Sequence, residues 1–223
     1  MQLLKNIAAR LPNRWQTELK RIHFERQIKR GNFLTDEPEY NMLHNFINPG
    51  DWVIDIGANV GHYTKRFSEL VGAYGRVIAF EPVPTTFYLL STNVQLFANQ
   101  NVSLMNAAIS DKLGVVGMSM PKFETGLDNY YQAHITTAAE SELSVLTIPL
   151  DSLCINQYIA LVKIDAEGHE SFVLAGMRKL IEASRPVLIV ETGSTDVITG
   201  LTSLGYLAEK LPNSPNVLFR PVV

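Results

Sequence analysis

The stretch that decides the fold runs from Trp52 to Gly61 and reads WVIDIGANVG. Its first half, WVIDI, is a short run of β-branched and aromatic residues, as is typical of a buried strand. Two glycines four residues apart follow, and from Val60 to about Val71 the apolar residues recur at helical spacing. Glycine permits a tight turn close to a ligand, and the first N–H groups of a helix attract anions. The sequence therefore predicts a strand, a binding turn and a helix in direct succession.

The same alternation of short strands and longer helices continues along the chain. Further strands are predicted at 76–80, 102–110, 158–165, 186–191, near 206–209 and near 216–220, helices at 84–98, 170–183 and 195–203, and two extended pieces at 115–120 and 143–148. Such alternation implies right-handed βαβ units and a mostly parallel sheet covered on both faces. The last two strands are joined by a short connection and are expected to pair antiparallel at one edge.

The composition is that of a globular chain with a sizeable core, because 46% of the 223 residues are hydrophobic and 18% are charged. The formal net charge of −3 excludes a globally basic nucleic-acid binder, so no nucleic-acid partner is expected. The charge is unevenly distributed: residues 1–30 hold eight basic and two acidic residues, and the remainder holds 11 basic and 20 acidic ones. The first 30 residues are therefore cationic and the rest of the chain is anionic.

Residues 1–47 are basic and helical in pattern, and they are predicted to form an N-terminal helical segment ahead of the main domain at 48–223. Apolar residues share one face on either side of Pro12: Leu3, Leu4, Ile7 and Leu11, then Trp15, Leu19 and Ile22. We expect a helix that packs on the domain and keeps its basic face in solvent. The alternatives are peripheral membrane contact through residues 1–30 and a segment that gates the substrate.

The single cysteine, Cys154, excludes an intramolecular disulfide and a multi-cysteine metal site. No apolar run reaches the length of a membrane span, and the opening residues are too often interrupted by charge for a signal-peptide core. We therefore expect a cytoplasmic protein without a transmembrane segment.

Acidic residues stand at the ends of the first two predicted strands, where open α/β sheets bind ligands. Asp55 closes the first strand, and Glu81 closes the second, where an acidic residue takes ribose hydroxyls. The glycine spacing departs from the dinucleotide fingerprint G-x-G-x-x-G, and no Walker lysine follows. After the third strand, the small residues of NAAISD (106–111) leave room for an adenine ring against the backbone.

A dense cluster of charge, KIDAEGHE, occupies residues 163–170 after a hydrophobic strand. Lys163 and Asp165 are two residues apart on a strand, so they share one face and can form an ion pair. Glu167 and His169 follow, and a carboxylate beside an imidazole raises its basicity, as a general base for a hydroxyl requires. His62, at the start of the first helix, is a lesser candidate for the same role.

Six blocks in this order resemble the FkbM-type S-adenosylmethionine (SAM)-dependent methyltransferases: VIDIGANVGHYT, VIAFEPVPTTFYLLSTN, NAAISD, LDSL, LVKIDAEGHESFVLAG and PVLIVE. The resemblance covers about residues 50–191, and the glycine turn is similar to motif I of class I methyltransferases. It implies a Rossmann-like α/β fold with a seven-stranded sheet ordered 3-2-1-4-5-7-6, strand seven antiparallel. The implied activity is methyl transfer from SAM to a hydroxyl of a small molecule, sugar or polyketide-like acceptor.

On this resemblance the cofactor is SAM, and the residues expected to bind it are Asp55, Gly57, Asn59, Gly61, Tyr63, Glu81, Ala108 and Asp165. The candidate catalytic residues are His169, Glu167 and Asp165. Three alternatives stay open: methylation of nitrogen, a SAM-binding module without catalysis, and an NAD-dependent oxidoreductase. The oligomeric state is left open as well.

Two further expectations concern metal and acceptor. Asp165, Glu167 and Glu191 can converge on a divalent cation, but no required metal is predicted. The polar segment 123–134 carries Tyr130, Tyr131 and His134, whose rings have apolar faces and polar edges suited to a sugar. This segment and the basic helix of residues 13–30 are together predicted to form the acceptor pocket.

Overall fold

The computed structural model describes residues 11–121, 133–136, 141 and 143–222. Its main sheet has seven strands in the order β10-β11-β9-β8-β1-β2-β3. Their bounds are Trp52–Ile56 (β1), Arg76–Phe80 (β2), Val102–Met105 (β3), Ile159–Ile164 (β8), Val187–Glu191 (β9), Tyr206–Lys210 (β10) and Asn216–Pro221 (β11). Only β11 runs antiparallel to its neighbours β9 and β10, and the other pairs are parallel. Numbered along this sheet, the strands follow the predicted order 3-2-1-4-5-7-6, and the antiparallel edge pair is confirmed.

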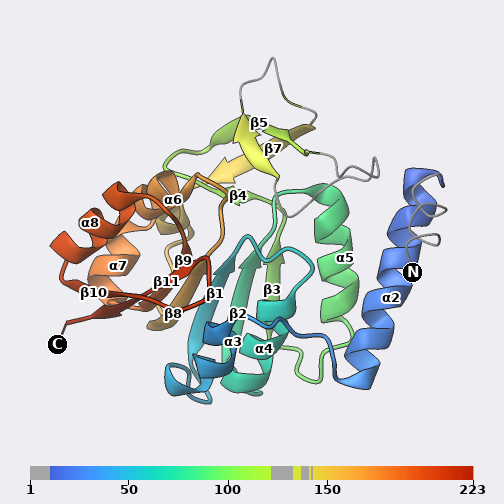
Figure 1. The fold of residues 1–223 in the computed structure, drawn as a ribbon, viewed down its shortest axis with the longest axis horizontal. Coiled ribbons are helices and arrows are strands. Elements are labelled where there is room, and N and C mark those ends of the chain that lie inside the picture. The colour runs from blue at the N-terminus through green and yellow to red at the C-terminus, as the bar shows by residue number, and fades with distance from the viewer. Residues whose placement is uncertain (1–10, 122–132, 137–140, 142, 223) are drawn as a thin grey trace.

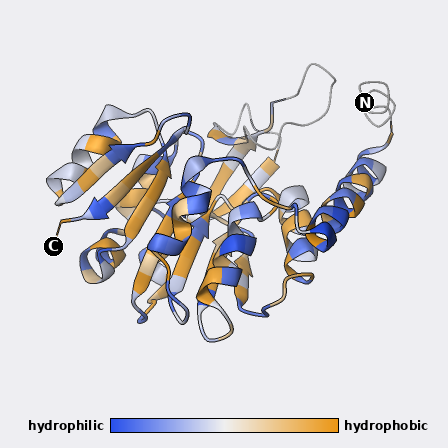
Figure 2. Cartoon of the chain, turned by 60° about the horizontal axis from the view of Figure 1, so that its bottom comes forward, coloured by the Kyte–Doolittle hydropathy of each residue, from blue (hydrophilic) through white to orange (hydrophobic). Residues whose placement is uncertain are grey.

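Helices cover both faces of this sheet (Figure 1). The helices α3 (Pro38–Met42), α4 (His62–Val71) and α5 (Pro84–Val94) lie on one face, and α6 (Glu170–Gly176), α7 (Arg178–Ser184) and α8 (Thr195–Ser203) on the other. Successive strand residues point to opposite faces, so Val53 packs toward α4 while Ile54 packs toward α6 and α7. Figure 2 shows these strands as largely apolar, which is why the sheet is buried from both sides.

A second, smaller sheet lies at the end of the molecule where β1, β2 and β8 finish, and it appears above the main sheet in Figure 1. It has the order β4-β7-β5-β6, formed by Ala108–Ile109, Leu143–Ile148, Gly114–Ser119 and His134–Thr136. The two extended pieces predicted at 115–120 and 143–148 are thereby confirmed as β5 and β7. Val83, Met118 and Val145 form its own small apolar core.

Three predicted boundaries are wrong. The strand expected at 102–110 is two strands, β3 and β4, in different sheets, because the chain turns at Asn106, whose side-chain amide donates to the carbonyls of Glu81 and Pro82. The helix expected at 170–183 is broken at Met177 into α6 and α7, since the carboxylate of Asp151 accepts the first N–H groups of α7. The helix begun at Pro84 ends at Val94 instead of near residue 98.

The N-terminal segment begins, within the described residues, with α2 (Asn13–Arg30), which lies beside α5 (Figure 1). Phe24 and Ile28 pack with Phe33 against α5. The face of α2 that carries Trp15 and Leu19 is exposed. The apolar stripe predicted from the sequence is therefore not the packing face, and its first members, residues 3–7, lie outside the described residues.

Residues after α2 join the core of the main domain. The short helices α3 and η1 (Leu43–Asn45) deliver Tyr40, Leu43 and Ile47 to the α4 side of the sheet. The division of the chain at residue 47 stays a prediction. None of the described helices has the length and apolar character needed to cross a membrane.

Candidate active site

A cavity of 270 Å³ opens at the carboxyl ends of β1, β2 and β8, beneath the second sheet. Seven of the residues predicted for the site line it: Gly57, Asn59, Glu81, Ala108, Asp165, Glu167 and His169. Met118 and Ile135 of the second sheet complete the wall, and neither was predicted from the sequence. Glu81 and three residues of the KIDAEGHE block, Asp165, Glu167 and His169, therefore line the same cavity, although they are far apart in the chain.

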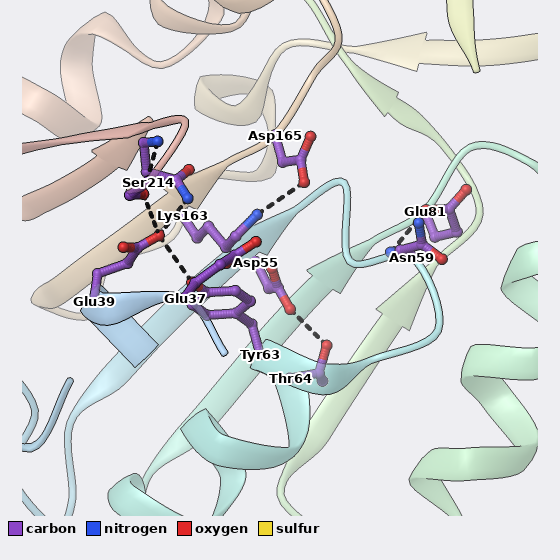
Figure 3. A network of polar contacts seen from close by, with 11 residues as sticks. Glu37, Glu39, Asp55, Asn59, Tyr63, Thr64, Glu81, Lys163, Asp165 and Ser214 are labelled. Atoms are coloured by element: carbon purple, nitrogen blue, oxygen red, sulfur yellow. Dashed lines mark hydrogen bonds and ion pairs between the residues drawn. The ribbon is translucent and has the colours of Figure 1, made fainter. Parts of the chain in front are cut away.

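Glu81 is buried at the rim of this cavity and is held by the backbone on both sides. One carboxylate oxygen accepts the N–H of Val83 and the other that of Asn59, each at 2.9 Å, and the second contact is drawn in Figure 3. Burial raises the pKa of Glu81 to about 7. Each oxygen keeps a second lone pair, so the fixed carboxylate can still accept hydrogen bonds from a diol.

The glycine turn is shaped by packing as well as by access to a ligand. Gly57 has a φ of 75°, and an added β-carbon would lie 1.9 Å from the backbone oxygen of Asp165. Gly61 has a φ of 98°, and its added β-carbon would meet Leu90 at 2.7 Å. Gly61 lines neither cavity described here and instead permits the close approach of α4 and α5.

A second cavity of 530 Å³ adjoins the first and shares Glu37, Gly57, Asn59 and Asp165 with it. The segment Leu34–Glu37, between α2 and α3, forms one side of it. Its other walls are mostly polar and come from α4 and from the ends of β1 and β8: His62, Tyr63, Asp55 and Lys163. The two cavities together form a continuous lining along the ends of β1 and β8.

A buried lysine balances the acids of this lining. Lys163 is 4% exposed, and its Nζ lies 3.0 Å from Asp165, which confirms the predicted ion pair. It is also the register partner of Asp55 on the neighbouring strand. Burial opposes the charge of Lys163, but the carboxylates of Asp165 and Asp55 outweigh it and raise its pKa.

Asp55 is fully buried at the end of β1, where Thr64 donates a hydrogen bond of 2.6 Å to its Oδ2 (Figure 3). Its Oδ1 has no hydrogen-bond partner among the described residues. Burial raises the pKa of Asp55 to about 6. An unpartnered buried carboxylate oxygen beside a cavity marks a place where a polar ligand is accepted.

Tyr63 does not line the first cavity but lies between two glutamates that sequence reasoning missed. Its hydroxyl contacts Glu37 and lies 3.2 Å from Glu39, and Lys163 sits over its ring at 4.8 Å (Figure 3). Glu39 is buried and also accepts from Ser214 at 3.0 Å and from Asn216. Burial, together with the two glutamates, raises the pKa of Tyr63.

His169 forms part of the first cavity wall immediately before α6. Its Nε2 lies 2.9 Å from the hydroxyl of Ser110, and its ring stacks on Phe172 with the centroids 4.5 Å apart. Burial lowers the pKa of His169, so the imidazole is neutral and available as a proton acceptor.

Acidic side chains line the same cavity as His169. Glu167 has a φ of 47°, and burial together with Asp165 raises its pKa. Glu191, on the same wall, has its pKa raised to about 7, first by burial and then by Asp165. Carboxylate oxygens of Asp165, Glu167 and Glu191 lie within 4.8 Å of one another. This wall is therefore the most negative part of the cavity.

His62, the lesser candidate base, belongs to the second cavity only. Its ring lies against Phe33 with the centroids 4.1 Å apart, and burial lowers its pKa to about 4. The ring is thus part of the aromatic packing that attaches the N-terminal segment, at a distance from the wall that carries His169.

The predicted acceptor pocket is only partly described. Tyr130 and Tyr131 lie outside the described residues. His134 begins β6, and its neighbours Ala133 and Ile135 line the first cavity. The basic helix α2, within its described residues, lines neither of these two cavities, and its part in an acceptor pocket stays a prediction. It packs on α5 instead, away from the ends of β1 and β8.

A family model described as the methyltransferase FkbM domain matches residues 55–207. The chain belongs to the FkbM methyltransferase family. The family and the class I SAM-methyltransferase fold expected from the sequence are thus confirmed.

Solved structures show the same fold. Methyltransferase FkbM from Methylobacillus flagellatus KT has a TM-score of 0.57 at 14% identity, over 90% of this chain and 59% of that chain. A Streptococcus mutans protein, SMU.1697c, solved in complex with SAH, has a TM-score of 0.50 at 12% identity, over 81% and 93% of the two chains.

A curated relative is similar over a shorter stretch. Ribosomal RNA large subunit methyltransferase E of Methanothermobacter thermautotrophicus is 34% identical over 73 residues, which are 30% of this chain and 34% of that protein. The chain therefore spans about a third of this relative in the match. Because the relative is an rRNA methyltransferase, it does not support the exclusion of nucleic acid that was drawn from overall charge.

Proposed function

We propose that this FkbM-family chain transfers a methyl group from SAM to a hydroxyl oxygen of a small-molecule, sugar or polyketide-like acceptor. One observation carries the proposal: Glu81 and His169 line the same 270 Å³ cavity. The first is a buried carboxylate suited to ribose hydroxyls, and the second a neutral imidazole suited to take a proton. When bound, SAM supplies a methyl group on a positively charged sulfur.

The residues present fit this cofactor. Glu81 is presented to accept the ribose hydroxyls, and the small side chains of Ala107 and Ala108 leave room for an adenine ring. The adjoining polar cavity, with Lys163 and the unpartnered Oδ1 of Asp55, offers both charges that an amino-acid end group requires. Asp165 lies on the wall common to the two cavities, where its carboxylate stabilises a nearby cation.

His169 is the proposed general base for the acceptor hydroxyl. An alcohol loses its proton around the transition state, and an imidazole kept neutral by burial can accept that proton. Glu167 lines the same cavity and contributes negative charge to it. Met118 and Ile135 give the acceptor an apolar wall, which excludes water from the reacting atoms.

Transfer without a metal is part of the proposal. Asp165, Glu167 and Glu191 are close enough together to hold a divalent cation, but the Lys163 ammonium already pairs with Asp165. Methyl transfer should therefore continue at an unchanged rate in EDTA. Activity that disappears in EDTA and returns with added Mg²⁺ would contradict this part.

The proposed activity is tested with SAM carrying a ¹³C-methyl group, incubated with purified protein and fractions of cell extract. We expect label in a small hydroxylated compound, with a methyl chemical shift typical of a methyl ether. Label on nitrogen would favour N-methylation, and label in the RNA fraction would replace the small acceptor by RNA. A thermal shift with NAD but none with SAM would favour an oxidoreductase.

The place of this reaction in the cell is proposed as well. Cys154 is free and exposed, which fits a reducing compartment such as the cytoplasm. Peripheral membrane contact through residues 1–30 stays an untested alternative role for the basic segment. Binding to anionic liposomes, compared between the full chain and a chain without these residues, addresses it.

A further inference from the structure

Ser110 does not line the first cavity but contacts His169, which does. It directly follows β4 and is 5% exposed, and it is absent from the cavity wall to which its neighbour Ile109 contributes. Its hydroxyl oxygen has two polar neighbours, Nε2 of His169 at 2.9 Å and Oδ1 of Asp111 at 3.3 Å. Asp111, Ser110 and His169 thus form a chain that ends at the cavity.

One direction of this chain satisfies both contacts with the available hydrogens. A serine hydroxyl has one hydrogen, and an ionised carboxylate can only accept. The Ser110 hydrogen therefore points to Asp111, and the oxygen of Ser110 accepts a hydrogen from Nε2 of His169. In the opposite arrangement, the lone pairs of Ser110 would face the Asp111 carboxylate, which is repulsive.

This direction leaves the second ring nitrogen of His169 without a hydrogen. Its Nδ1 makes no hydrogen bond to any residue that the structure describes. A neutral imidazole protonated at Nε2 carries its basic lone pair on Nδ1. Nδ1, which has no hydrogen-bond partner among the described residues, is thus the nitrogen that can accept a proton.

Packing holds the ring in this orientation. The ring of His169 is stacked on Phe172, with an interplanar angle of 16°. At the other end of α6, an added β-carbon on Gly176 would lie 1.9 Å from the backbone oxygen of Ser110. The helix that follows His169 and the strand end that carries Ser110 are therefore in direct contact.

We propose that Ser110 and Asp111 are positioning residues that hold His169 as the Nε2–H tautomer, so that Nδ1 takes the proton of the acceptor hydroxyl. The proton passes from the hydroxyl oxygen to Nδ1, and the ring becomes an imidazolium that still donates from Nε2 to Ser110. This inference rests on the proposed role of His169 as the base.

The tautomer is measured directly by ¹⁵N NMR of the histidine rings, which requires neither an acceptor nor activity. The signals of His169 are assigned from their loss in His169→Gln. We expect Nε2 to be protonated and Nδ1 bare in the unmodified protein. Asp111→Ala frees the Ser110 hydrogen to point at Nε2, so the Nδ1–H form should become populated. Lys112→Ala is the matched control, because Lys112 is exposed and its ion pair with Asp111 is long, at 3.7 Å.

Turnover supplies the second measurement. Asp111→Ala and Ser110→Ala should lower kcat by about tenfold or more with an unchanged KM for SAM, as expected when a base is in the wrong tautomer. Lys112→Ala should keep full turnover. A His169 that is Nδ1–H in the unmodified protein, or a tautomer unaffected by Asp111→Ala and Ser110→Ala, would overturn the inference. Full turnover in His169→Ala would overturn the proposed base itself, whatever the tautomer.

Discussion

The backbone oxygen of Asp165 lies 1.9 Å from the point that a β-carbon on Gly57 would occupy. The turn after β1 and the end of β8 are therefore in direct contact at the floor of the site. The N–H of Asp165 also donates to the carbonyl of Ile56 at 3.0 Å, which continues the pairing of the two strands. The motif glycine thus fixes the position of a proposed catalytic residue.

Gly57→Ala is expected to destabilise the fold as well as to abolish SAM binding. The added carbon meets backbone rather than a movable side chain, and the φ of 75° disfavours any L side chain. We expect the free energy of unfolding to fall by about 2 kcal/mol or more in urea denaturation. Gly193→Ala is the control, because nothing lies within 4 Å of its added carbon. Equal unfolding midpoints for the two variants would contradict the packing role of Gly57.

Glu81→Ala is expected to weaken SAM binding without unfolding the protein. Loss of a charge-assisted hydrogen bond to ribose corresponds to about 1.5–3 kcal/mol, or roughly tenfold to over a hundredfold in Kd. Calorimetric titration with SAM measures the change, and circular dichroism checks the fold. Glu209→Ala, at an exposed carboxylate, should bind SAM as the unmodified protein does. Unchanged affinity in Glu81→Ala would remove Glu81 from the cofactor site.

Lys163→Met is expected to be strongly destabilising. It removes the ammonium that pairs with Asp165 beside the buried Asp55, and breaking a buried pair costs about 3–5 kcal/mol. Urea denaturation measures the loss, with the exposed Lys210→Met as the control. Adding Asp55→Asn to Lys163→Met should restore part of the stability, because one uncompensated charge disappears. Full stability in the single variant would show that the pair contributes nothing.

The preference for SAM over SAH should increase as the pH rises from 6 to 8. The pKa of Glu191 is raised to about 7, so this side chain is mostly protonated at the lower pH and ionised at the higher one. The new negative charge favours the sulfonium of SAM over the neutral sulfur of SAH, by about threefold to tenfold. Calorimetry with both ligands gives the ratio, and Glu191→Gln should flatten its pH dependence. A ratio that stays constant in the unmodified protein would place the sulfonium away from Glu191.

Much of this architecture follows from local pattern. Short β-branched runs predict the strands, and acids at strand ends such as Asp55 and Glu81 predict the edge at which a ligand binds. The glutamates of the N-terminal segment could not be found in this way. Glu39 accepts hydrogen bonds from Ser214 and Asn216, about 175 residues away, and no local periodicity encodes such a contact. The same holds for Met118 and Ile135, because their place depends on how the second sheet docks.

The contact between His169 and Ser110 is a second feature that the sequence did not predict, for a different reason. Both residues lie in blocks that were singled out from the sequence, NAAISD and KIDAEGHE, yet nothing in either block predicts that their side chains meet at 2.9 Å. That contact follows from the break of the predicted strand at Asn106, which turns the chain toward α6. The break of this predicted strand, which the sequence pattern did not show, thus provides the contact that supports His169.

The most direct test of the account is the rate of methyl transfer in His169→Ala, measured beside its affinity for SAM with the acceptor found by labelling. If His169 is the base in a SAM site formed by Glu81 and Asp165, turnover should fall by about 10²–10⁴ while the Kd for SAM stays near that of the unmodified protein. Undiminished transfer, or loss of SAM binding together with turnover, would contradict the account.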